Sequence, residues 1–172
     1  MMLKCTIFGM TAFTIAWCAT AAPALSQNLT VNIQHPSGAG SIELSRSFDV
    51  VIRNSSRSVE KVWDENCSWG WQNIRVIMGS DKEKLLFERH NVGWRANLPS
   101  FSKLPPGEST VRHINLLDNT WPIAEMRKFA KGRPNLKVSI DLTVTPDRES
   151  KKLGIWVGTV SSDYEQASLS LN

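Results

Sequence analysis

Cysteine is scarce in this chain of 172 residues, and two of the three, Cys5 and Cys18, lie close to the N-terminus. The third, Cys67, cannot form an internal disulfide once the N-terminal pair is removed, and it lacks the Cys-x-x-Cys spacing of a structural zinc site. Free cysteine is among the most buried residue types. We therefore expect Cys67 to be a buried thiol, with an intermolecular disulfide as the alternative.

Histidine is equally sparse, and His35, His90 and His113 are far apart in the sequence. No Gly-x-Ser-x-Gly motif marks a serine nucleophile, and no His-x-x-x-His pair marks a metal site. Three arrangements in space stay open. They are a Cys67 nucleophile with a histidine base, a metal site in which Asp64, Glu65 and Cys67 join a histidine, and a copper site formed by Cys67, His90, His113 and Met78. We favour none of these, and we predict a non-enzymatic protein with no catalytic residue, no metal ligand and no cofactor.

Long apolar runs and a strong charge of one sign are also lacking. Beyond residue 22 no stretch is apolar enough to cross a bilayer. The net charge is +4, and basic side chains alternate with acidic ones, as in Asp81-Lys-Glu-Lys84. Such mixed clusters are typical of solvated turns rather than of nucleic-acid-binding surfaces. We therefore expect no nucleic-acid partner and no membrane span after the signal is removed.

Residues 1–26 have the pattern of a secretory signal peptide. Lys4 gives a positive start, residues 7–22 are uncharged and apolar, and Ala24-Leu-Ser26 offers small residues for cleavage after position 26. This predicts export to the periplasm or the cell exterior. The alternatives are a membrane anchor, for which the segment is short, and a lipoprotein attached through Cys18, which follows the bulky Trp17.

Residues 27–172 have the alternation of an antiparallel β protein. Apolar side chains take every second position over residues 42–52, with one break at Arg46, and again over residues 136–144. One apolar and one polar face are typical of half-buried antiparallel strands. Turn-forming residues divide the chain into seven or eight short strands, which predicts two packed sheets. We expect the remaining strands at 29–33, 71–78, 84–89, 110–117, 153–160 and 167–171.

One segment, residues 120–131, departs from the β pattern. Thr120 can cap a helix, Pro122 falls in its first turn, and Gly132 can end it. Apolar residues recur between these positions at helical spacing. We predict a short helix here that crosses from one sheet to the other.

The run from residue 48 to residue 117 resembles bacterial immunoglobulin-like β-sandwich domains. The matching features are an apolar strand ending in Asn54-Ser55, a central tryptophan-bearing strand, and Leu104-Pro-Pro-Gly-Glu-Ser109 before a strand. Within that class the chain is loosely similar to the bacterial intracellular proteinase inhibitor type, but it differs in its expected export and its extra helix. The resemblance implies an all-β, Ig-like antiparallel sandwich with one short crossover helix, and it carries no inhibitory residues over to this chain.

The densest feature is a run of nine residues with three tryptophans, Trp63-Asp-Glu-Asn-Cys-Ser-Trp-Gly-Trp71. Each tryptophan has roughly 150–250 Å² of surface to bury, so we expect at least one to be core. If the run is extended, Trp69 and Trp71 share a face, because residues two apart on a strand point the same way. Either could then join Trp94 and Arg95, from a later loop, in a weakly basic aromatic surface.

The sequence therefore predicts one exported domain over residues 27–172 that binds a protein or a cell-envelope partner. The expected binding residues are Trp69, Trp71, Trp94 and Arg95. The same tryptophan face could instead bind sugar, so a second candidate function is a module that binds cell-envelope glycan. Proteinase inhibition is a third, carried only by the resemblance.

Overall fold

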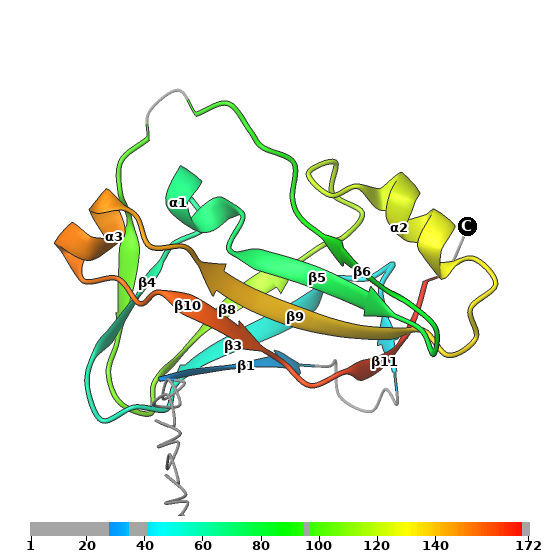
Figure 1. Ribbon diagram of the computed structural model, residues 1–172, viewed down its shortest axis with the longest axis horizontal. Coiled ribbons are helices and arrows are strands. Elements are labelled where there is room, and N and C mark those ends of the chain that lie inside the picture. Colours follow the sequence, from blue (N-terminus) through cyan, green and yellow to red (C-terminus); the bar gives the residue numbers. More distant parts are fainter. Residues whose placement is uncertain (1–27, 35–40, 95–96, 170–172) are drawn as a thin grey trace, which may run out of the picture.

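The computed structural model describes residues 28–34, 41–94 and 97–169, and these form an all-β protein with few helices (Figure 1). The predicted signal segment, His35 and Arg95 lie outside the described residues. The all-β prediction is confirmed. In chain order the elements are β1 (Leu29–Gln34), β2 (Ile42–Glu43), β3 (Phe48–Asn54), β4 (Glu60–Trp63), α1 (Ser68–Trp71), β5 (Ile74–Gly79), β6 (Lys84–Phe87), β7 (Phe101–Leu104), β8 (Ser109–Ile114), α2 (Ile123–Ala130), β9 (Lys137–Val144), α3 (Arg148–Leu153), β10 (Gly158–Ser161) and β11 (Glu165–Ser168).

The strands form three sheets. One sheet has the antiparallel order β1-β3-β8, and a larger one has the order β2-β11-β9-β5-β6, with β10 also pairing with β9. All pairs are antiparallel except β11 with β2. The third sheet is the pair β4 and β7, which lies with α3 at the end of the molecule opposite α2 (Figure 1). Side chains of both larger sheets join in one hydrophobic core.

The two segments with predicted alternation contribute to this core, residues 136–144 as β9 and residues 42–52 as two strands, β2 and β3, of different sheets. In β3 the buried residues alternate with more exposed ones, and Val50 and Ile52 are almost fully buried. Val138 and Ile140 of β9 are fully buried in the same core. The break in alternation at Arg46 lies in a turn, which separates β2 from β3.

Over the described residues there are eleven strands against the seven or eight expected, because residues 42–52 form two strands and because no clear alternation marks β4 and β7. They extend the β3–β8 ribbon past a corner at Asn54. The Asn54 side chain is fully buried, and its Nδ2 donates to the carbonyl oxygens of Ser58 (2.6 Å) and Leu104 (2.7 Å). One buried amide therefore joins both chains of the ribbon where the backbone ladder is interrupted.

The predicted crossover helix is α2, which joins β8 of the smaller sheet to β9 of the larger one. It begins after Pro122, and no side chain caps it, so the expected cap at Thr120 is wrong. Two more helices, α1 and α3, were not predicted. α3 begins at Asp147, whose side chain accepts from the amide of Ser150 (2.6 Å) while the Ser150 side chain accepts from the amide of Asp147. This reciprocal cap makes a helix where a turn and the start of a strand were expected.

Candidate functional site

Trp69 and Trp71 lie on α1, a single helical turn. Cys67 precedes it in an extended conformation, and its carbonyl accepts from the amides of Gly70 (3.1 Å) and Trp71 (3.0 Å). In a helix, residues two apart are about 200° apart around the axis. Trp69 and Trp71 were expected to share a face only if this segment was extended, and that condition is not met because the segment is helical.

Gly70 allows this turn to pack against the end of β4. A Cβ atom at position 70 would lie 2.0 Å from the carbonyl oxygen of Asp64. No side chain fits at that distance, so the close approach of the two backbones requires glycine. The glycine sets which way each neighbouring tryptophan points.

The Trp69 side of α1 packs against the core. The ring of Trp69 stacks on that of Trp63, with centroids 5.7 Å apart, and Phe101 packs edge-on against Trp63 at 6.5 Å. Trp63 is 4% exposed and Cys67 is 1% exposed. The thiol of Cys67 donates to the carbonyl of Asp64 at 3.2 Å. The predictions of a core tryptophan and a buried thiol are both confirmed.

The Trp71 side of α1 contacts the loop between β6 and β7. Trp71 and Trp94 pack edge to face, with ring centroids 6.1 Å apart, and both are partly exposed. The indole nitrogen of Trp71 donates to the carbonyl of His90 at 2.9 Å. The structure therefore brings together two of the four predicted site residues, Trp71 and Trp94. Trp69 lies on the other side of α1.

A buried arginine packs against the ring of Trp71. The guanidinium of Arg89 lies 4.6 Å from the ring centre of Trp71 and 5.2 Å from that of Trp121, and Arg89 is 7% exposed. Its Nη1 pairs with Glu65 at 2.8 Å. Burying a charge is costly unless it is paired, and here the ion pair and two aromatic faces compensate. Sequence reasoning missed Trp121 and considered Glu65 only as a possible metal ligand, since nothing in their spacing links them to Arg89.

The loop after Arg89 is fixed to α1 and to the segment before it. The Asn97 side chain donates to the hydroxyl of Ser68 (2.5 Å) and accepts from the Ser68 amide (3.0 Å). Further along, the Ser100 carbonyl accepts from the Asp64 amide, and the Ser100 hydroxyl donates to the Asp64 carboxylate at 2.5 Å. Between these attachments Leu98 is 79% exposed, the highest value among the large hydrophobic side chains described. Sequence reasoning missed Leu98, and a Leu-Pro pair inside a loop was the only signal for it.

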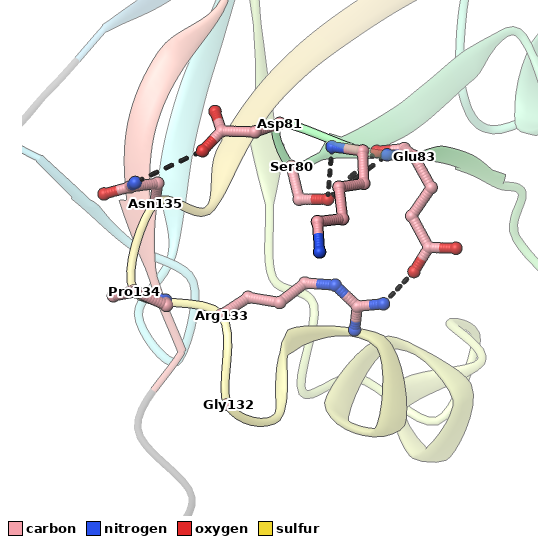
Figure 2. Close-up of a pocket in the computed structure, with 8 residues that line it drawn as sticks. Ser80, Asp81, Glu83, Gly132, Arg133, Pro134 and Asn135 are labelled. Carbon is pink, nitrogen blue, oxygen red and sulfur yellow. Dashed lines mark hydrogen bonds and ion pairs between the residues drawn. The ribbon is translucent and has the colours of Figure 1, made fainter.

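A separate pocket of about 480 Å³ lies at the α2 end of the molecule. Its charged groups are largely engaged with one another: Arg133 pairs with Glu83, and Asn135 donates to Asp81 at 3.3 Å (Figure 2). The guanidinium of Arg133 also lies over the ring of Phe129 at 4.2 Å. This pocket shares no residue with the tryptophan cluster.

The candidate metal ligands do not gather in the structure. His113 pairs with Asp49 at 2.6 Å on the smaller sheet, Met78 is fully buried in β5, and Cys67 lies under α1. In the described ranges no three His, Cys, Asp or Glu side chains are placed to hold a metal ion. None of the helices in those ranges has the length and apolarity needed to span a membrane.

Fold and site together define an all-β protein with a half-exposed aromatic cluster, followed by a segment that is bonded to α1 at Asn97 and to Asp64 at Ser100. Comparison of the chain with protein-family models, curated proteins and solved structures found no match. The case for a function therefore depends on this chain's own geometry.

Proposed function

We propose that this protein is an exported, non-enzymatic, Ig-like β-sandwich domain that binds a protein partner of the cell envelope through the loop surface. We define the loop surface as the side chains of Trp71, Trp94, Asn97 and Leu98. The observation that carries the proposal is Leu98, which is 79% exposed between two attachments of its loop to the body of the protein.

The attachments matter because binding costs conformational freedom. A flexible loop must be ordered when its partner binds, at about 0.5–1.5 kcal/mol for each immobilised side chain. The bonds from Asn97 to Ser68 and from Ser100 to Asp64 supply much of that order before any partner arrives. Tryptophans are enriched among the few side chains that dominate protein interfaces, so Trp71 and Trp94 would supply the anchors of this surface and Leu98 further apolar area.

The geometry supports a protein partner better than a glycan. Sugar rings stack on open, flat aromatic faces, and two rings in one plane make the best platform. Trp71 and Trp94 are inclined at 80°, and Arg89 lies over a face of Trp71. Trp69, the other candidate, stacks on Trp63.

The test compares Leu98→Ser with Val111→Ser, a matched control at a half-exposed position on β8. Immobilised wild type and both variants are exposed to cell-envelope protein and, separately, to envelope polysaccharide. We expect one protein to be retained by wild type and by Val111→Ser but lost with Leu98→Ser. Equal retention by all three would contradict the proposal, and retention of polysaccharide would favour the glycan-binding alternative.

Proteinase inhibition is a second candidate function, favoured by the same exposed leucine on an attached loop. An inhibitory loop must present a side chain to the proteinase while resisting rearrangement, and Leu98 meets both requirements. Assay against a panel of serine and cysteine proteinases tests it. Inhibition that weakens in Leu98→Ser would support this candidate, whereas no inhibition across the panel would remove it.

A further inference from the structure

β6 forms one edge of the larger sheet, and past its end the amide of His90 donates to the carbonyl of Thr120 at 2.7 Å. β6 is the last strand in the order of the larger sheet, and its sole strand partner among the described residues is β5. Leu85 and Leu86 are 46% and 48% exposed on this edge. Open edges carrying apolar side chains pair readily with another strand, so natural proteins usually protect them with charged residues.

The charges on this edge form an unusual pattern. Lys84 and Leu86 lie two apart on β6 and project from the same face of the sheet. Glu88 follows one residue after the strand ends, and its ion pair with Arg75, two residues before the Leu86 partner Ile77, places it on that face too. The Lys84 ammonium lies 4.5 Å from the ring centre of Tyr164, and Glu88 pairs with Arg75 at 2.7 Å. Both charges are thus held on the outer face, one on each side of an exposed leucine.

We propose that β6 pairs antiparallel with β6 of a second copy of this chain, around a two-fold axis beside Leu86. In this register Leu86 meets Leu86, and Lys84 of each copy lies opposite Glu88 of the other. The same surface then serves both copies, as a two-fold interface requires. Lys84 and Glu88, which protect the edge against unrelated strands, then form two cross-strand pairs of opposite charge between the copies.

Neighbouring registers lack this complementarity. A two-fold axis centred on Leu85 places Lys84 opposite Leu86, and one centred on Phe87 places Glu88 opposite Leu86. Phe87 itself is 6% exposed and packs on Phe129, so it does not move to make the contact. Charge and apolar matching therefore select one register out of three.

A short edge gives a small interface, at the weak end of specific association, below about 1,200 Å². We therefore expect a reversible dimer whose population rises with protein concentration. The proposal is independent of the loop surface, because β6 and Leu98 contribute separate side chains.

The first experiment is sedimentation velocity across a concentration series, on the chain from residue 27, which holds every described strand and helix. Wild type should show a monomer–dimer equilibrium. Leu86→Lys places two ammonium groups together at the axis and should leave a monomer at every concentration. Val111→Lys, at a comparably exposed position on the other sheet, should dimerise like wild type. A monomeric wild type, or equal effects of the two variants, would overturn the proposal.

The second experiment reverses the charges one at a time. Lys84→Glu and Glu88→Lys should each lose the homodimer, because each places like charges opposite each other. Mixed together, the two variants carry opposite charges at both positions and should form a heterodimer. Native mass spectrometry with one variant isotopically labelled detects that species. Its absence, or the persistence of either homodimer, would exclude this register.

Discussion

The two sides of α1 show how one short aromatic run serves two roles. On one side Trp69 stacks on Trp63 in a cluster with Phe101, and on the other Trp71 packs against Trp94 under a loop. The two sides differ in what they contact, which is the β4–β7 pair in one case and the segment after β6 in the other. One helical turn, held close by Gly70, is enough to send two partly exposed tryptophans to different neighbours.

The largest expected effect is on the buried side. Trp63→Ala removes a ring that is 4% exposed and leaves a cavity beneath Trp69. We expect the free energy of unfolding to fall by about 3–5 kcal/mol, as for other buried tryptophan truncations. Urea denaturation measures it. Trp71→Ala is the comparison, since Trp71 is partly exposed, and an equal loss in the two variants would contradict the division between the sides.

The second-largest loss of stability is expected from a change in α1, the helical turn between the two sides. Gly70→Ala drives a Cβ atom into the Asp64 carbonyl, so α1 must shift, at a cost of about 1–3 kcal/mol. Gly93→Ala is the matched control, because nothing lies within 4 Å of its added Cβ. Thermal unfolding of both variants gives the difference. If Gly70→Ala unfolds at the wild-type temperature, the close approach does not constrain α1.

The sequence predicted elements whose pattern repeats over many residues. The alternation in 136–144 and the helical spacing in 120–131 each correspond to one observed element, whereas the alternation in 42–52 spans two strands and the turn between them. α1 has no such period. It forms because Gly70 fits against the Asp64 carbonyl, which is a contact between segments that local propensity does not encode.

The site was predictable only in part, for a related reason. A shared surface of Trp71 and Trp94 follows from two tryptophans left over once the core is filled, and the structure brings them into contact. The position of Leu98 depends on a bond between Asn97 and Ser68, which lie 29 residues apart in the sequence. A single hydrogen bond between distant residues produces no repeating pattern in the sequence. Sequence reasoning therefore missed Leu98, the most exposed residue of the loop surface.

An intermediate effect should follow from loosening the loop. Asn97→Ala removes both bonds to Ser68, and we expect a loss of about 1 kcal/mol, typical of a net side-chain hydrogen bond. Limited proteolysis should cut the loop faster than in wild type. Asn91→Ala, an exposed asparagine of the same loop, should behave like wild type. Unchanged cleavage in Asn97→Ala would mean that the Ser68 bonds do not order the loop.

The smallest effect on stability belongs to the most exposed residue. Leu98→Ser removes an apolar side chain that is already mostly in water, so the free energy of unfolding should change by no more than about 0.5 kcal/mol. Leu116, which is 1% exposed, is the contrasting leucine, and Leu116→Ala should cost about 2–5 kcal/mol. Thermal unfolding of both variants tests this. A large loss in Leu98→Ser would show that the leucine is packed in solution, and the loop surface would then lose the exposed residue that distinguishes it from the Trp69 side.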